Sequence, residues 1–150
     1  MNTGGGIALP TFRCGAHRPV SMEGTMNRLS TWPLERALQI IGGRWKLYIL
    51  CHLADGPQRL SQLQRGIPVI SQKVLIQQLR EMEEHGLVRR EVYPEVPARV
   101  EYSMTELGES LAPIIDQLQL WGIHHGESMG ERDKLLICER FSERIEANAA

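Results

Sequence analysis

The sequence predicts a mainly α-helical domain with one small β-hairpin, an α+β fold. Three features of the middle of the chain predict it. They are a short helical segment at 61–65 that breaks at Gly66-Ile-Pro68, a longer helical segment from Ser71 to Gly86, and two strand-like segments, 87–93 and 99–104, around a proline-containing loop. This order is the plan of a winged helix-turn-helix domain, which places its second helix in the major groove of DNA.

The size and composition of the chain fit one domain with a tail. It has 150 residues, of which 42% are hydrophobic and 23% charged. No apolar run approaches the roughly 18 residues of a membrane span, and the N-terminus lacks the pattern of a secretory signal, so we expect no membrane partner. Three cysteines without a C-x-x-C pair argue against a disulfide framework. We expect a cytoplasmic protein.

The net charge of −1 hides an uneven distribution. Residues 1–43 carry four Arg and two Glu, a balance of +2. Residues 44–99 carry nine Lys and Arg against six Asp and Glu, a balance of +3. Residues 100–150 carry four basic and ten acidic residues, a balance of −6. A mildly basic middle permits nucleic-acid binding, and the acidic C-terminal part is expected to stay away from phosphate.

The elements before the central unit follow from glycine and proline positions. Residues 1–26 are rich in Gly, Pro and small polar residues and are expected to form a flexible tail. Pro33 opens a short helix that runs to Ile41, since proline suits a first helical position. Gly42-Gly43 interrupts it. A second helix is expected over 44–54, with Gly56 as its C-terminal cap.

Within the central unit each element has its own signal. Gln58-Arg-Leu60 is expected to form a short strand that pairs with the hairpin. Ser71 is an N-cap, because its hydroxyl can accept from the free amides of the first turn. The long helix then turns Leu75, Leu79 and Met82 toward the domain. In the hairpin, buried residues alternate with polar ones, as a sheet with one buried side requires. The residues expected on the buried side are Val88, Val92, Val100, Tyr102 and Met104.

After the hairpin the sequence predicts one long helix capped by Thr105. Its apolar stripe recurs at helical spacing over four turns, and Pro113 inside it should produce a kink. The stripe comprises Leu107, Leu111, Ile114, Leu118 and Trp121. Gly122 to Gly130 reads as a break, so we expect the winged domain to span 27–126. A separate C-terminal amphipathic helix is expected within 127–150.

The exposed face of the Ser71 helix suits contact with bases. Gln can bond both hydrogen-bonding atoms of an adenine edge, and Lys or Arg can reach guanine acceptors. Gln72, Lys73 and Gln77 are therefore the predicted base contacts. Arg80 is the weakest cation of this face, because Glu83 or Glu84 lies one turn away. The alternative is a solvated helix face.

Other residue types suit the DNA backbone. Ser71 at the helix start can hold a phosphate near the free amides. Arginines that flank the hairpin suit phosphate or the minor groove, where a wing would meet DNA. The predicted set is Ser71, Arg80, Arg89, Arg90 and Arg99. The alternative for the hairpin arginines is a structural role.

A series of linked motifs over residues 32–122 resembles the HxlR-type regulators, a branch of the MarR-like winged-helix proteins. They include Ile41-Gly-Gly-Arg-Trp-Lys46, Gly56-Pro-Gln-Arg-Leu-Ser-Gln-Leu63, Ile70-Ser-Gln-Lys-Val-Leu75, Leu79-Arg-Glu-Met-Glu83, Gly86-Leu-Val-Arg89, Tyr93-Pro-Glu-Val-Pro97, Val100-Glu-Tyr-Ser-Met-Thr105 and Trp121-Gly122. The resemblance implies a homodimer, with the Ser71–Arg80 segment as recognition helix and the prolyl loop as wing. It favours a repressor on a pseudo-palindromic operator whose half-sites lie about 34 Å apart.

The resemblance also implies that the first helix and the helix after the wing form the dimer interface. The apolar stripe after the hairpin favours the same interpretation, although it would also serve to close the monomer core. The predicted interface residues are Trp32, Leu38, Ile41, Leu111, Ile114, Leu118 and Trp121.

The sequence departs from the family at the position before Pro33. Family members that sense oxidants carry a cysteine there, and this chain has Trp32. Cys51 and Cys138 lie on apolar helix faces and are interpreted as packing residues. Cys14 lies in the tail and is the remaining, weak redox candidate.

Other classes of function are poorly supported. His124 and His125 are adjacent and so point apart on a helix, no metal site or cofactor is predicted, and no catalytic constellation stands out. The main alternative is a winged helix that binds a protein partner without sequence-specific DNA binding. A further alternative is a regulator gated by a small apolar effector held near Trp32, Trp45 and Trp121.

Overall fold

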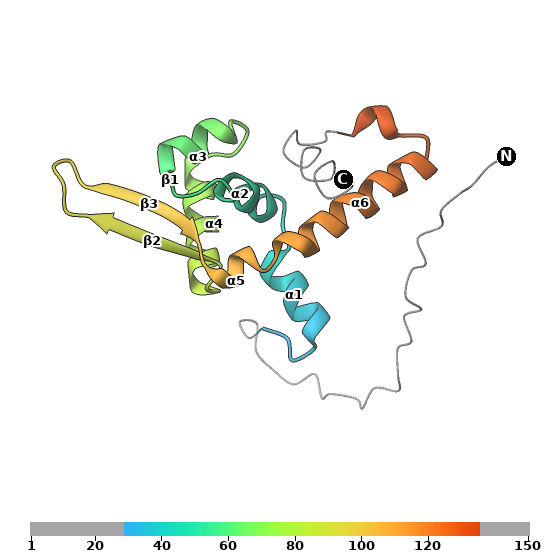
Figure 1. Cartoon of the computed structure of the whole chain (residues 1–150), viewed down its shortest axis with the longest axis horizontal. Helices are drawn as coiled ribbons and strands as arrows, with labels where there is room; N and C mark the ends of the chain where they lie inside the picture. The colour runs from blue at the N-terminus through green and yellow to red at the C-terminus, as the bar shows by residue number, and fades with distance from the viewer. Residues whose placement is uncertain (1–28, 136–150) are drawn as a thin grey trace, which may run out of the picture.

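A computed structural model describes residues 29–135 of the chain. The hairpin projects to one side of the helical body and α6 projects to the other (Figure 1). The elements, in chain order, are α1 (Pro33–Ile41), α2 (Lys46–Leu53), β1 (Gln58–Arg59), α3 (Leu60–Gly66), α4 (Gln72–Glu84), β2 (Val88–Tyr93), β3 (Arg99–Met104), α5 (Glu106–Glu109), α6 (Ala112–Ser128) and the 3-10 turn η1 (Arg132–Lys134). The predicted winged helix-turn-helix is thereby confirmed.

The three strands form one antiparallel sheet in the order β1-β3-β2. β3 is the central strand, and it pairs Tyr102 with Gln58 on one side and with Arg90 on the other. The short first strand was predicted, and its pairing with the hairpin is confirmed. By this pairing the start of α3 is fixed against the base of the wing.

One apolar core holds the helix-turn-helix to the sheet. The predicted inward face of α4, Leu75, Leu79 and Met82, is fully buried. It packs in the same cluster as side chains from α2, α3, β2, β3 and α6. Each fully buried Leu or Met contributes about 1.5–3 kcal/mol. The other buried members are Ile49, Leu50, Leu53, Leu63, Ile67, Ile70, Leu87, Val88, Tyr102 and Ile115.

Gly86, which follows α4, and Thr105, which precedes α5, meet at the base of the wing. Gly86 has φ +73°, a left-handed conformation that favours glycine, and it ends the helix where predicted. The hydroxyl of Thr105 donates to the carbonyl of Gly86 at 2.5 Å and accepts from the amide of Gly108 at 3.1 Å. Thr105 is therefore the predicted N-cap and also a bridge across the base of the wing.

The region after the wing differs from the prediction. The prediction of a single kinked helix is wrong, because the chain forms two helices, α5 and α6, with a break at Ser110 and Leu111. Pro113 lies in the first turn of α6, where its missing amide costs no helical hydrogen bond. The predicted break at Gly122 is also wrong, since α6 continues to Ser128. The expected C-terminal helix lies mostly outside the described residues, as does the expected tail.

Candidate nucleic-acid interface

The exposed surface of α4 begins at a well-capped N-terminus. The Ser71 hydroxyl accepts from the Val74 amide at 3.3 Å, as its predicted capping role requires. With the apolar face buried, Lys73, Gln77 and Arg80 stand exposed on the opposite face. Among the described residues neither Lys73 nor Arg80 has an ion-pair partner, so both charges are available to a ligand.

The turn before α4 is held by side-chain hydrogen bonds from α3. The Gln64 amide group donates to the carbonyl of Ile70 at 2.5 Å. At the start of α3 the backbone amide of Arg59 donates to the Gln62 side-chain oxygen at 2.8 Å. The Gln64 bond fixes the turn before α4 to α3, and the Gln62 bond caps the start of α3.

An ion pair fixes α4 from its other side. Lys46 Nζ lies 3.1 Å from Glu81 Oε2, and the Lys46 side chain is only 7% exposed. Glu81 Oε1 accepts from the Gln77 amide group at 3.1 Å. The Gln77 hydrogen bond and the Lys46 ammonium lower the pKa of Glu81. Gln77, a predicted base contact, therefore has one amide hydrogen committed within the protein.

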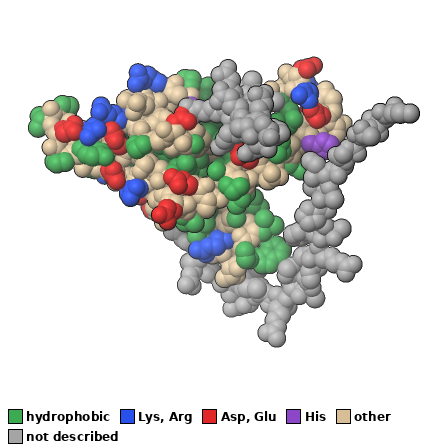
Figure 2. Space-filling view, viewed as in Figure 1, with side chains coloured by type: hydrophobic (Ala, Val, Ile, Leu, Met, Phe, Trp, Pro, Cys, Tyr) green, Lys and Arg blue, Asp and Glu red, His purple; other side chains and the backbone are tan. Residues whose placement is uncertain are grey.

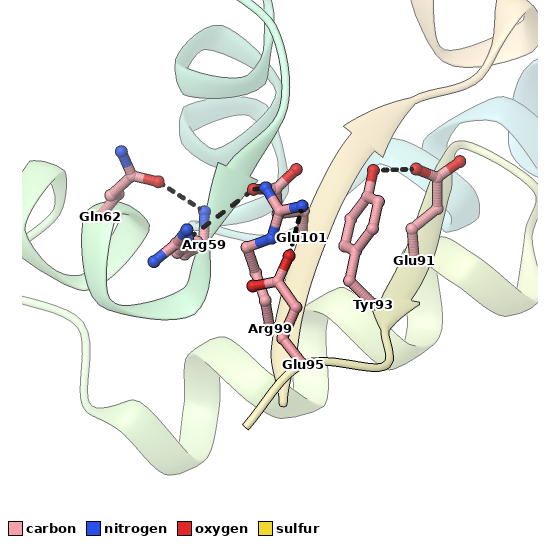
Figure 3. Close-up of polar contacts among 7 residues, drawn as sticks. All are labelled: Arg59, Gln62, Glu91, Tyr93, Glu95, Arg99 and Glu101. Carbon is pink, nitrogen blue, oxygen red and sulfur yellow. Dashed lines mark hydrogen bonds and ion pairs between the residues drawn. The ribbon is translucent and has the colours of Figure 1, made fainter. Parts of the chain in front are cut away.

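A network of side chains stabilises the wing near the loop that joins β2 to β3 (Figure 3). Arg99 contacts two carboxylates, Glu95 at 3.0 Å and Glu101 at 3.1 Å, and its guanidinium lies 4.0 Å above the centre of the Tyr93 ring. The Tyr93 hydroxyl donates to Glu91 at 2.8 Å, and this bond raises the pKa of Tyr93. Arg99 was predicted to contact DNA, yet two carboxylates already neutralise it.

The two other wing arginines differ in their availability. Arg89 is exposed but lies 3.3 Å from Glu91. Arg90 is exposed, and no described residue forms an ion pair with it. The tip itself carries no cation, and its Val96 side chain is fully exposed. Figure 2 shows this hydrophobic tip at the far end of the hairpin, with acidic and basic side chains interleaved behind it.

A groove of about 700 Å³ runs between the helix-turn-helix and the wing. Gln72 lines this groove, so its side chain lies beside α3 and the wing loop as well as at the start of α4. Arg59, the last residue of β1, and Arg65 of α3 also line it. Sequence reasoning missed both arginines, although the pairing of β1 with the hairpin was a signal that α3 would face the wing.

A second surface of note is apolar. Five predicted interface residues on or beside α1 and α6 are exposed, and Trp121, which stacks on His125 at 5.4 Å, is 65% exposed. Two others are not. Ile41 is buried within the chain, and Leu111 is half-buried against the core. The exposed five are Trp32, Leu38, Ile114, Leu118 and Trp121.

The other predicted features contribute less to the candidate interface. Cys51 is half-buried and packs against the core, as interpreted from the sequence. Cys14 and Cys138 lie outside the described residues. Within residues 29–135 no group of His, Cys, Asp and Glu has the arrangement of a metal site, and no helix is long and apolar enough to cross a membrane. Trp45 packs near Tyr48 and under Arg44, and neither it nor the other tryptophans lines the groove.

Comparison with known proteins identifies the family. The family model described as HxlR-like helix-turn-helix matches residues 40–129. The chain belongs to the HxlR-like helix-turn-helix family. It is therefore a winged helix-turn-helix transcriptional regulator, and the predicted resemblance is confirmed.

Relatives of this HxlR-like regulator have the same description. An uncharacterised HTH-type transcriptional regulator of Methanothermobacter thermautotrophicus is 51% identical over 102 residues, 66% of this chain and 78% of the relative. The uncharacterised regulator YdeP of Bacillus subtilis is 37% identical over 129 residues, 86% of this chain and 98% of YdeP. Both are regulators of transcription, a class of DNA-binding protein.

A solved structure supports the fold. The redox regulator HypR in its reduced form matches 65% of this chain and 97% of its own chain, with 44% identity and a TM-score of 0.61. The helix-turn-helix and the wing lie within residues 40–129, which the family model matches.

Proposed function

We propose that this protein is a homodimeric repressor that binds a pseudo-palindromic operator through α4 and the wing. The observation that supports it most is the exposed face of α4, which offers Lys73, Gln77 and Arg80 beside a wing that starts at its end. Lys73 has the chemistry to reach guanine acceptors, and Gln72 and Gln77 have the chemistry to read adenine. Ser71, Arg89 and Arg90 are the proposed phosphate contacts. A regulator of this kind works in the cytoplasm, where the DNA is, and needs no catalytic group.

The dimer is proposed from the exposed apolar residues of α1 and α6. Hydrophobic side chains gather over α1 in Figure 2, away from the wing. A patch of this composition favours a second protein surface over water. A two-fold dimer would present two α4 helices to one face of the duplex, with half-sites about 34 Å apart.

We propose that the signal to which this regulator responds is not the oxidation of a thiol at the start of α1. Trp32 precedes Pro33 and is the N-cap residue of α1, so no thiol stands at this position. HypR, which is named a redox regulator, therefore supports the fold and the regulatory class of this chain but not a redox trigger at this position. An effector that binds near the exposed Trp32 and Trp121 would quench their fluorescence.

The test is binding of the full-length protein to DNA from upstream of its own gene. Fluorescence anisotropy over a salt series should give a linear fall of log K with log salt, and an unrelated duplex of equal length should bind at least about 10³-fold more weakly. Equal affinity for both duplexes would reject an operator-specific regulator. No binding to either would favour the protein-interaction module instead.

A further inference from the structure

Val74 is an apolar residue on the otherwise polar exposed side of α4. Of the exposed side chains on this helix, all of which lie within the described residues, it is the only apolar one. A lone exposed valine is common on protein surfaces, but this one is next to Lys73 in sequence and one turn before Gln77, two proposed base contacts. It is also the third residue of α4, in the part of the helix from which a helix-turn-helix protein contacts base edges.

Val74 shares one stripe of α4 with Gln77, Gln78 and Glu81. Residues at i, i+3, i+4 and i+7 lie on the same side of a helix, with about 5–6 Å between the Cβ atoms of neighbours. Helical side chains lean toward the N-terminus of the helix, so the residues at i+3 and i+4 ordinarily cover the residue at i. By this rule the two glutamines would lie over Val74.

Glu81 holds both glutamines in the opposite direction. The side-chain amide of Gln77 donates to Glu81 Oε1 at 3.1 Å, and that of Gln78 donates to Glu81 Oε2 at 3.5 Å. The Lys46 ammonium of α2 fixes the same carboxylate, 3.1 Å from Oε2. Because both amide groups are held toward the C-terminal end of the stripe, the Val74 side chain keeps 38% of its surface exposed.

The hydrogen-bonding groups that Gln77 retains match one type of base pair. One of its two amide hydrogens is committed to Glu81, which leaves the second hydrogen and the side-chain oxygen. This donor and acceptor suit N7 and the N6 amino group of adenine. The thymine paired with that adenine carries a methyl group in the major groove. Base pairs are about 3.4 Å apart, so a side chain one turn from Gln77 meets the methyl of the same pair or of its neighbour.

We propose that Val74 is a specificity-determining residue that contacts the 5-methyl group of a thymine in the operator. The inference rests on the proposed function and adds to it the base that each half-site must contain. The thymine belongs to the A·T pair bound by Gln77 or to the adjacent pair. Burial of one methyl group against Val74 favours thymine over uracil about 3- to 5-fold in each half-site.

The test removes the two partners of this contact, one at a time and then together. Deoxyuridine in place of thymine deletes the methyl group and keeps the hydrogen-bonding groups of the base. Placed at symmetry-related thymines of both half-sites, it should weaken operator binding by the full-length wild type about 10- to 25-fold at one position. Val74→Ala should bind the natural operator about as weakly, and deoxyuridine at that position should weaken it no further. Val74→Ile, which keeps a branched apolar side chain, should respond as the wild type does.

Two further measurements separate this contact from a general loss of binding. The slope of log K against log salt should be unchanged in Val74→Ala, since an apolar contact releases no counterions. Val92→Ala is the matched control, because this exposed valine lies on the wing strand β2. It should remain as sensitive to deoxyuridine as the wild type is.

The outcomes distinguish the inference from the proposed function. If deoxyuridine weakens Val74→Ala as much as the wild type, or weakens the wild type at no position, the inference is wrong and the proposed function stands. If the wild type binds no DNA, the proposed function fails and the inference fails with it.

Discussion

The ammonium of Lys46 is buried 3.1 Å from Glu81 Oε2 and ties α2 to the C-terminal half of α4. The same carboxylate accepts from Gln77, one of the proposed base contacts. The position of a proposed base-contact side chain thus depends on a charge pair within the protein. Because Lys46 belongs to the segment 41–46, this contact links one family motif to the proposed recognition helix.

Glu81→Gln should lower the free energy of unfolding by about 2–4 kcal/mol. The change leaves the Lys46 ammonium nearly buried without its counter-charge, which is the costly way to break such a pair. Chemical denaturation measures the effect. Glu84→Gln, on the exposed side of the same helix, is the control and should change stability by less than about 0.5 kcal/mol. Equal effects of the two variants would show that the Lys46–Glu81 ion pair adds nothing to the free energy of unfolding.

The stability of the wild type should fall in acid through the same carboxyl group. The Gln77 hydrogen bond and Lys46 hold the pKa of Glu81 below its ordinary value. A lowered folded-state pKa stabilises the protein above the unfolded-state pKa, and this contribution is lost as the pH falls through the folded-state pKa. Denaturation at a series of pH values should therefore show the gap between wild type and Glu81→Gln narrowing below about pH 4.5. A gap that is constant down to pH 3 would contradict this assignment.

Lys73→Ala should weaken operator binding about 10-fold and reduce the salt slope by up to about 0.9. Lys73 is exposed and has no ion-pair partner among the described residues, so the loss needs no rearrangement within the protein. Anisotropy titrations against operator and unrelated DNA measure affinity and specificity together. Lys134→Ala, which removes a lysine paired with Glu131 beyond α6, should bind as the wild type does. Wild-type affinity for Lys73→Ala would remove this residue from the interface.

Glu95→Gln should strengthen DNA binding about 2- to 5-fold at low salt. The variant removes one of the two carboxylates that hold Arg99 and also removes a negative charge from the wing loop. The gain should shrink as salt rises, because it is electrostatic. Glu131→Gln, an equal change of charge beyond α6, is the control. Weaker binding of Glu95→Gln would mean that the Arg99 brace orders the wing for DNA.

The elements of the fold were largely predictable because local signals mark them. Ser71, Gly86 and Thr105 are caps whose chemistry depends on neighbours in sequence, and the structure has each in its predicted role. The error after the wing came from reading Pro113 as an interruption. The same residue suits a first helical turn, and only the break at Ser110 and Leu111 decides between the two.

The candidate site was less predictable because it depends on side-chain contacts that the sequence pattern does not specify. Arg99 was predicted to contact DNA, but Glu95 of the wing loop and Glu101 of β3 hold its guanidinium. Arg65 reads as a helix-surface residue, and only the β1–β3 pairing brings α3 to the wing. Ile41 fits an apolar interface by type, yet it is already buried within its own chain.

Gly108→Ala should destabilise the protein by at least about 2 kcal/mol. A Cβ at this buried position would collide with the carbonyl oxygen of Leu87, a backbone atom that cannot move aside cheaply. Thermal or denaturant unfolding measures the loss. Gly122→Ala is the matched control, since nothing lies within 4 Å of its Cβ and the position is inside α6. This control should be neutral or gain about 0.5–1 kcal/mol from helix propensity. Comparable losses in both variants would contradict the close approach of α5 to the backbone of Leu87, just before β2.

Leu118→Asp should convert the proposed dimer to a monomer. Leu118 is exposed on α6 in the single chain, so the substitution removes no core contact but would bury a carboxylate in the interface. Sedimentation velocity should show half the mass, and operator affinity should fall at least about 100-fold because each half-site would be bound separately. Val69→Asp, an equal change at an exposed position in the turn before α4, should remain dimeric. A dimeric Leu118→Asp would move the interface away from this face of α6, whereas a monomeric wild type would remove the two-fold arrangement from the proposed function.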